Sequence, residues 1–449
     1  MKRAFLASLL FALPIPFAAC SSSSNGTTPA SDAGTGDSGG GDAGSSVSSN
    51  IQHIVIVVQE NHTFDSHFGK YCTAAAGSNP TCNDGPACCE AIPPTDPSGA
   101  TPVTIDDAMM GSYDPSHVQA CENAEMNGGA MDMYTNAPGC GNPMNVGIAD
   151  ATIIKPYWDL AGQNALADRY FQSLSGQSSS NDMYLARANF VFKDNSANPQ
   201  GAIGAACQIG GTAAQYPDQT IGDLLTTAGV DWAFFAEGYK AASDASAAGK
   251  CAASDPACPT PSPYYPCTYD PGDDPFTFYA SSVDNSADMK DFADFTAALT
   301  SGSGLPAVSW VKGIGYKTEH PGYGDKLSDG VTFVTGVASA VAASSYASST
   351  LLIVTYDESG GYYDHIAPPA TSSVDNQPYG PRIPMMAIGP FAKKNYVSHV
   401  QMEHGSLVKF IEWNWLGKQT GQLDTRDKVV NNIGDMLDAT ATGTQVPAN

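Results

Sequence analysis

The sequence predicts an α/β fold, in which a central, mostly parallel sheet carries helices on both faces. Two β-branched runs, 51–58 and 349–356, are nearly continuously apolar, which is typical of strands buried on both faces of a parallel sheet. Helical patterns alternate with such runs along the chain, and this alternation indicates crossover connections. Long stretches rich in Gly, Pro and Cys separate the elements, so we also expect long, disulfide-linked loops.

Each expected element rests on its local pattern. The strands are expected at 51–58, 231–236, 306–311, 349–356 and 383–388, and the helices at 288–299, 326–343 and 406–415. The last helix places its apolar residues on or near one face. Two segments, 72–150 and 240–287, are expected to be long loops, and loops of this length in a compact body are usually functional or cross-linked.

Composition and charge exclude several classes of protein. The chain has 449 residues, with 20 Lys or Arg against 45 Asp or Glu, and its formal net charge is −25. Such a chain lacks the basic face that nucleic-acid binding needs, so we predict no nucleic-acid partner. Charge-driven docking on anionic lipid is disfavoured for the same reason. Hydrophobic residues make up 42%, which is enough for a sizeable core and excludes wholesale disorder.

The first 20 residues resemble a bacterial lipoprotein signal peptide. Lys2 and Arg3 precede an apolar run, 5–19, which is too short to span a membrane and is typical of an export signal. The run leads into F-A-A-C at 17–20, which resembles a lipobox with Phe in place of the commoner Leu. We therefore expect lipid on Cys20 and an exported protein anchored at the bacterial cell envelope. Ordinary cleavage nearby, which would leave a free thiol, is the alternative.

Four parts follow from the changes in composition. They are the signal peptide and lipobox at 1–20, a tether at 21–50, a folded domain at 51–437 and a C-terminal tail at 438–449. The tether contains ten Ser and seven Gly, and Val47 is its one sizeable apolar side chain. Burial therefore cannot offset the entropy lost on ordering this segment, and we expect it to be flexible.

The cysteine count supports disulfides. Of 11 cysteines, ten remain if Cys20 carries lipid, and an even set in an exported protein indicates disulfide bonds. These ten are Cys72, Cys82, Cys88, Cys89, Cys121, Cys140, Cys207, Cys251, Cys258 and Cys267. A zinc site within 72–89 is the disfavoured alternative, because the spacings do not match paired C-x-x-C motifs. The sequence leaves the pairing open.

Polar residues follow the two strongest predicted strands. Glu60 and Asn61 come after the first strand, and Asp357 and Glu358 come after the other. Ligands bind at the carboxyl ends of strands in open α/β sheets. Three carboxylates so close would repel one another, so a cation is expected among them, and oxygen ligands favour a hard or borderline divalent metal. The glycines at 360–361 permit the required turn. Solvated loop carboxylates or helix caps are the alternative.

Two longer motifs resemble a known family. Residues 60–69, E-N-H-T-F-D-S-H-F-G, and 355–365, T-Y-D-E-S-G-G-Y-Y-D-H, are similar to signatures of the bacterial phosphoesterase family. That family includes phosphatidylcholine-type phospholipases C and a respiratory-burst-inhibiting acid phosphatase. The similarity continues at 379–384 and 398–412 and covers roughly 51–420. It implies an alkaline-phosphatase-like fold.

The resemblance also implies roles for particular residues. Glu60, Asn61, Asp357 and Glu358 would hold one divalent metal ion, whose identity the sequence leaves open. The family's nucleophile lies in a G-P-[TS]-x-P-N segment, and G-Q-S-S-S-N at 176–181 occupies that place.

Ser178 is therefore the expected nucleophile and a further metal ligand. Both prolines of the family segment are lost, and Ser179 stays an alternative, as does a linker-like role for these serines. His117 and His320 match two family histidines and would bind phosphate oxygens or protonate the leaving alcohol.

One departure from the family concerns a third histidine. The family's H-N-P-F stretch is D-D-P-F at 273–276, so Asp273 stands where the family has histidine. An anionic residue there is expected to repel phosphate or to change the preference for the leaving group. His365, His399 and His404 are interpreted as structural or supporting residues.

These observations predict a metal-dependent hydrolase of phosphate esters, phospholipase C-like or acid phosphatase-like, that forms a phosphoseryl intermediate. The substrate would be a phosphomonoester or a phospholipid, and the acidic surface favours a cationic head group such as choline. A catalytically weak or inactive surface binding protein is the alternative, supported by Asp273 and the altered Ser178 loop. A carboxyl-ester hydrolase is disfavoured because no G-x-S-x-G elbow occurs within 51–437.

Overall fold

The computed structural model describes residues 47–208, 210–283 and 285–449. Cys20, the signal peptide and residues 21–46 of the expected tether therefore lie outside the described residues. The strands are β1 His53–Gln59, β2 Val103–Ile105, β3 Gly147–Ala149, β4 Ala165–Ala167, β5 Ala197–Pro199, β6 Thr212–Ala214, β7 Trp232–Ala236, β8 Met289–Asp291, β9 Val308–Lys312, β10 Thr350–Tyr356, β11 Met385–Ile388 and β12 Tyr396–Ser398. The α-helices are α1 Phe64–Phe68, α2 Asp107–Ser112, α3 Gln119–Met126, α4 Ala151–Gln163, α5 Ser178–Arg187, α6 Ile221–Thr227, α7 Tyr239–Ala247, α8 Phe292–Ser301, α9 Leu327–Ala343, α10 His404–Trp415 and α11 Ala439–Thr442.

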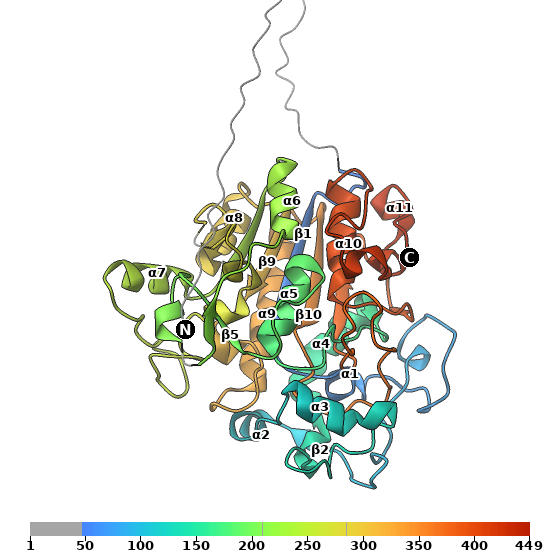
Figure 1. Cartoon of the computed structure of the whole chain (residues 1–449). Coiled ribbons are helices and arrows are strands. Elements are labelled where there is room, and N and C mark those ends of the chain that lie inside the picture. The colour runs from blue at the N-terminus through green and yellow to red at the C-terminus, as the bar shows by residue number, and fades with distance from the viewer. Residues whose placement is uncertain (1–46, 209, 284) are drawn as a thin grey trace, which may run out of the picture. The chain divides into compact units, whose positions relative to one another are not determined.

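The main sheet of the described chain has eight strands in the order β12-β4-β11-β10-β1-β9-β7-β8. Three of them, β1, β9 and β10, are labelled in Figure 1. β1 lies at its centre and pairs in parallel with β10 on one side and with β9 on the other. Only β11 runs against its neighbours, β10 and β4. The last residues of β1 and β10, Gln59 and Tyr356, are direct partners, so the two chains leave the sheet at the same level.

Helices cover both faces of this sheet, as the sequence predicts. Ile54, Ile56 and Val58 of β1 pack into one hydrophobic core together with residues of α5, α6 and α10. Val55 and Val57 pack into a second core with residues of α1, α4, α8 and α9. Successive side chains of a strand point to opposite faces, and β1 is apolar on both. That is why its sequence is a continuous apolar run.

The two expected long loops are mostly loop, but they also contain short elements. The segment 72–150 contains β2, β3, α2 and α3, and the segment 240–287 includes most of α7. These elements are short, with three to nine residues each. An element of one or two turns cannot display a full hydrophobic period. Local caps mark some of them instead: the Asp106 side chain accepts from the backbone amides of Ala108 and Met109 at the start of α2.

The disulfide prediction is confirmed. All ten cysteines outside the N-terminal region are paired, as Cys72–Cys89, Cys82–Cys88, Cys121–Cys140, Cys207–Cys251 and Cys258–Cys267. The four cysteines within 72–89 thus form two disulfides with one another, which leaves no thiolate there for the alternative zinc site. Cross-links of this kind restrict the unfolded chain and stabilise segments that have little core of their own.

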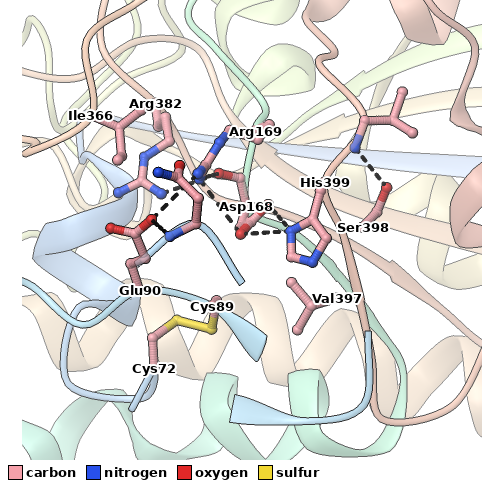
Figure 2. Close-up of polar contacts among 12 residues, drawn as sticks. Cys72, Cys89, Glu90, Asp168, Arg169, Ile366, Arg382, Val397, Ser398 and His399 are labelled. Atoms are coloured by element: carbon pink, nitrogen blue, oxygen red, sulfur yellow. Dashed lines mark hydrogen bonds and ion pairs between the residues drawn. A yellow bond between two sulfur atoms is a disulfide. The ribbon is translucent and has the colours of Figure 1, made fainter. Parts of the chain in front are cut away.

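A polar network joins the disulfide-linked segment 72–89 to residues that follow the strands β4 and β12 (Figure 2). Asp168, just after β4, accepts a hydrogen bond from Nδ1 of His399 at 2.9 Å. The other ring nitrogen of His399 lies 2.7 Å from the carbonyl oxygen of Cys82. Arg169 reaches Asp168 at 3.5 Å and Glu90 at 3.8 Å. Both carboxylates are fully buried. Through its two ring nitrogens, His399 connects Asp168 with Cys82, which lie far apart in the sequence.

We expect this network to make stability depend on pH. The hydrogen bond with Asp168 raises the pKa of His399 above its ordinary value of 6.5. A raised pKa means that the contact stabilises the fold fully below pH 6.5, and that the contribution is lost as the pH rises through the folded-state pKa. His399→Gln should remove up to about 1 kcal/mol at pH 5.5 and little at pH 8.5. Urea unfolding of both proteins across this range measures the difference, and an equal loss at both pH values would contradict the assignment.

Residues on either side of the expected 51–437 domain also contact it. The backbone amide of Ser48 donates to the carbonyl oxygen of Asn414 at 2.7 Å, and the Ser49 hydroxyl donates to the side chain of Asn414 at 2.6 Å. Near the other end, Val446 is buried in the core. Within the described residues, no helix combines the length and the apolar character that crossing a bilayer requires.

Candidate active site

The candidate site lies where three neighbouring parallel strands end. Glu60 follows β1, Asp357 follows β10, and Lys312 is the last residue of β9. The backbone amide of Asp357 still donates to the carbonyl oxygen of Gln59 at 3.0 Å, which keeps the two chains together beyond the strand ends. By the alternation along each strand, these three side chains lie on the face that α5 and α10 cover.

The turn after β10 brings the second pair of predicted metal ligands against the first. Gly360 and Gly361 have φ values of 65° and 70°, in the left-handed region that favours glycine. This agrees with the turn expected from the sequence. A Cβ at Gly360 would overlap the backbone carbonyl of Asn61, so the turn packs directly on Asn61. The amide of Gly360 also donates to Glu358 at 2.5 Å.

The buried carboxylates of this site strongly affect each other. Burial and the charge of Glu60 raise the pKa of Asp357 well above its usual value, and burial together with Asp357 does the same for Glu358. Burial alone would raise the pKa of Glu60 as well, but the neighbouring charge of Lys312 lowers it overall. Carboxyl groups crowded in this way gain stability from a cation beside them.

The oxygen atoms present suit a hard metal ion. Oδ1 of Asn61, Oδ2 of Asp357 and Oε1 of Glu358 are buried and have no hydrogen-bond partner in the described protein. Carboxylate and amide oxygens are the ligands that such ions take. The set is nevertheless looser than two other groups among the described residues, whose ligand atoms all lie within 4.8 Å of one another: His62 with His67 and Glu319, and Asp65 with Asp364 and His365.

Lys312 is a site residue that the sequence analysis missed. Its Nζ lies 2.8 Å from Oε1 of Glu60 and 3.8 Å from carboxylate oxygens of both Asp182 and Asp273. Its side chain is 4% exposed. These neighbours raise its pKa despite burial, so Lys312 is a fixed positive charge. The signal was available, because Lys312 directly follows the predicted strand 306–311 and the strand-end argument applies there too.

Ser178 begins α5 and faces Asp357. It lies close enough to Asp357 to lower the pKa of that carboxyl group, and it lines a cavity of about 340 Å³ together with Glu60 and His320. The amino end of a helix carries partial positive charge that favours phosphate. The alternative nucleophile, Ser179, does not line this cavity; its backbone amide donates to Asn195 at 3.0 Å.

The two predicted catalytic histidines contact each other. The rings of His117 and His320 lie 5.7 Å apart, edge to face. His320 lines the cavity, whereas Nε2 of His117 lies 3.8 Å from Oε1 of Glu358. Burial lowers the pKa of His117, which favours the neutral ring. His404 lies beneath the site, with Nε2 2.7 Å from the carbonyl oxygen of Asp357.

Comparison with known proteins identifies the family. Residues 51–416 match the Phosphoesterase family. The chain belongs to this family. It is 25% identical over 405 residues to the non-hemolytic phospholipase C of Burkholderia pseudomallei, covering 81% of this chain and 55% of that protein. It is also 25% identical over 418 residues to phospholipase C B of Mycobacterium tuberculosis, covering 80% and 72%. The chain thus spans about half the length of the Burkholderia relative.

Solved structures give weaker similarities. A phosphonate monoester hydrolase from Silicibacter pomeroyi is 13% identical, with a TM-score of 0.36, and the match covers 79% of this chain and 78% of that one. A protein of the alkaline phosphatase superfamily from Vibrio parahaemolyticus is 10% identical, with a TM-score of 0.32 and coverage of 70% and 71%.

Asp273, which the resemblance places at the position of a family histidine, lines the cavity. Burial raises the pKa of Asp273 well above its usual value, and Nζ of Lys312 lies 3.8 Å from its carboxylate. The expectation that this residue repels phosphate stays a prediction.

Tyrosine rings line the cavity of the candidate site. The rings of Tyr265 and Tyr323 lie 5.3 Å apart, and each lies about 5.5 Å from the ring of His320. Tyr264 also lines the cavity, and the carboxyl group of Asp270 faces the same space. Tyr323 is 52% exposed and Tyr264 41% exposed, so a ligand can reach these rings from solvent.

A buried carboxyl group supports the loop that carries Ser178. Glu122 of α3 accepts hydrogen bonds from the amide of Gly176 at 2.6 Å, the side chain of Gln172 at 3.1 Å and the hydroxyl of Ser359 at 2.8 Å. One side chain therefore joins the loop before Ser178 to the turn after Glu358. Burial raises the pKa of Glu122 to about 8.

Proposed function

We propose that the protein hydrolyses phosphate esters with Ser178 as nucleophile and one divalent metal ion as cofactor. The observation that supports this most strongly is the position of Ser178, which lies beside Asp357 and lines an acidic cavity together with Glu60, the partner of Lys312. Membership of the Phosphoesterase family agrees with it. The arrangement places the hydroxyl of Ser178, the positive charge of Lys312 and a ring that can transfer protons, His320, in one site.

The bond and proton changes of this reaction involve the chain's own side chains and water. Ser178 gives its proton to water as Oγ forms a bond to phosphorus, the phosphorus–oxygen bond to the alcohol breaks, and the alcohol leaves with a proton from His320. Asp357, beside Ser178, would orient the hydroxyl. Water then attacks the phosphoseryl group: one of its protons restores the Ser178 hydroxyl, its oxygen stays on the phosphate product, and His320 takes a proton back from solvent.

Glu60, Asn61, Asp357 and Glu358 would hold the metal ion, with Ser178 beside it. A bound divalent ion neutralises phosphoryl oxygens and lowers the pKa of the attacking hydroxyl. Lys312 contributes a further positive charge near Glu60. Phosphoryl transfer depends mainly on positioning and charge stabilisation, and these groups are of the types that supply both.

The cavity supports a substrate with a cationic head group. Asp270 and Glu60 make it acidic, and the rings of Tyr264, Tyr265 and Tyr323 line it. Aromatic rings together with carboxylates bind quaternary ammonium groups well. We therefore propose a phospholipid such as phosphatidylcholine as the preferred substrate, with phosphomonoesters as the second candidate. The phospholipase C names of the relatives agree with this choice.

We also propose that the exported protein is anchored by lipid on Cys20. The support is the signal-like segment 1–19 followed by the lipobox-like F-A-A-C. Expression of the full chain and of Cys20→Ser in a bacterial host tests this. The wild-type protein should enter the detergent phase on phase separation and the variant should not.

A substrate panel tests the activity. The purified protein should release diglyceride from phosphatidylcholine, or phosphate from p-nitrophenyl phosphate, and lose at least about 90% of that rate after chelation of divalent ions. Restoration by one of Zn²⁺, Mn²⁺ or Ca²⁺ would identify the metal. No turnover on either substrate with any of these ions would favour the alternative, a binding protein that retains the fold. Turnover that chelation leaves unchanged would contradict the metal.

A further inference from the structure

We propose that Glu319 is a positioning residue that fixes three segments of the active site from the opposite side of the sheet. This inference rests on the proposed function, because it concerns how the same site is held. Glu319 is fully buried and directly precedes His320. It does not line the active-site cavity.

Four side chains converge on the Glu319 carboxylate. The hydroxyl of Tyr356 donates to Oε2 at 2.6 Å, and Nε2 of His67 lies 3.0 Å from the same oxygen. The amide of Gln59 donates to Oε1 at 3.3 Å, and the hydroxyl of Tyr157 donates to this oxygen as well. Each carboxylate oxygen therefore has two partners, in a place closed to solvent.

Two of these partners and Glu319 itself are immediate neighbours of site residues. Gln59 precedes Glu60, and Tyr356 precedes Asp357, in the same way that Glu319 precedes His320. Neighbouring side chains of an extended strand point to opposite faces, so Gln59 and Tyr356 face away from Glu60 and Asp357. Glu60 and His320 line the cavity, whereas Gln59 and Tyr356 bind the Glu319 carboxylate behind it.

The register of the sheet explains why this works. Gln59 and Tyr356 are direct partners across β1 and β10, so their side chains lie next to each other on one face. Gln59 also donates to the carbonyl oxygen of Lys317 at 3.1 Å. The amide of Glu60 donates to the carbonyl oxygen of Thr318 at 2.7 Å. The strand ends and the segment that carries His320 are thus tied together on both sides of Glu319.

The conformation of Glu319 itself indicates that the segment is held under constraint. Its φ is 71°, a left-handed value that costs energy for a residue with a side chain and persists only where the surroundings impose it. Gly330 of α9 makes the necessary space: a Cβ there would overlap Cγ of Glu319 and come within 2.9 Å of its Cδ. A side chain at Gly330 would therefore displace the carboxylate.

A metal site at His62, His67 and Glu319 is the other interpretation of this cluster, since their ligand atoms lie within 4.8 Å of one another. Each carboxylate oxygen of Glu319, however, already has two hydrogen-bond partners among the four side chains that converge on it. The hydrogen-bonded arrangement therefore agrees better with the structure, and metal counting can tell the two apart.

Crystal structures of the wild type and of Glu319→Gln test the proposal directly, whether or not the protein is active. Glutamine has nearly the same size as glutamate, but its amide group replaces one acceptor oxygen. That amide group would face two hydrogen-bond donors. We expect the side chains of Glu60, Asp357 and His320 to shift or to become disordered. Titration of the metal-free proteins with Mn²⁺ and Zn²⁺ by calorimetry should show at least tenfold weaker binding in the variant. Unchanged side chains with metal affinity within twofold of wild type would overturn the proposal.

A matched pair on α9 covers the case in which Glu319→Gln does not fold. Gly330→Ala pushes Glu319 away, whereas Gly336→Ala, on the same helix, meets no atom within 4 Å. Gly330→Ala should weaken metal binding and lower kcat ten- to a hundredfold with KM within threefold of wild type. Gly336→Ala should leave all three unchanged. Equal effects of the two substitutions would overturn the proposal.

Metal counting separates the remaining outcomes. A second bound equivalent of metal in the wild type, lost in Glu319→Gln, would assign the cluster as a metal site and overturn the hydrogen-bonded arrangement. If the wild type turns over no phosphoester but the side chains still shift in Glu319→Gln, the proposed function fails and the positioning role stands.

Discussion

Ser178→Ala should lower kcat on any accepted phosphoester by at least about a thousandfold, because removal of a nucleophile leaves only binding and charge stabilisation. Ser178 is 3% exposed and starts α5, and alanine fits there without a new contact. The unfolding midpoint should therefore stay close to that of the wild type. Steady-state kinetics of the metal-loaded protein on p-nitrophenyl phosphate and phosphatidylcholine provide the measurement.

Ser179→Ala is the matched control. Ser179 is 4% exposed, is the next residue on the same helix and undergoes the same chemical change, but it does not line the cavity. Its kcat should remain within about threefold of wild type. If Ser179→Ala is inactive and Ser178→Ala is not, the nucleophile is Ser179 and the assignment of Ser178 is wrong.

Arg382→Met should destabilise the protein by about 3–5 kcal/mol, the cost of leaving buried charges without a partner. The guanidinium of Arg382 is fully buried. It donates to Asp364 at 2.9 Å, to Asp65 at 3.0 Å and to the carbonyl oxygen of Asp168 at 3.1 Å. Methionine fills part of the volume but leaves Asp364 without its ion-pair partner and Asp65 with His365 alone. The free energy of unfolding in urea measures the effect.

Lys155→Met is the comparison for Arg382. Lys155 pairs with Asp159 on the surface of α4, and both side chains are more than half exposed. Ion pairs of this kind contribute less than about 1 kcal/mol. Similar losses for the two substitutions would show that burial does not set the contribution of the Arg382 network.

The sequence predicts the centre of the fold well and its periphery poorly. β1 and β10 are apolar on both faces because both faces are covered, and that pattern identifies buried strands from sequence alone. α5 has no such pattern. Ser178 to Ala186 are all buried, polar side chains included, because they face the site and α10. Its helical state depends on tertiary contacts that a one-dimensional pattern does not contain.

The same reasoning explains which site residues were found. Glu60 and Asp357 follow recognisable strands, and strand ends in parallel sheets converge. Lys312 follows a weaker strand, and the same rule was not applied to it. Glu319 could not be predicted to bind Gln59 and Tyr356, because those contacts join segments that are 260 and 37 residues apart and depend on register.

Trapping of the covalent intermediate tests the central claim most directly. The metal-loaded wild-type protein is mixed with excess p-nitrophenyl phosphate, quenched in acid within the first turnovers, digested and analysed by mass spectrometry. The account predicts one phosphate on the peptide that contains Ser178, and none on the corresponding peptide of Ser178→Ala. Turnover without a phosphorylated peptide at quench times within the first turnovers, or phosphate on a different residue, would contradict it.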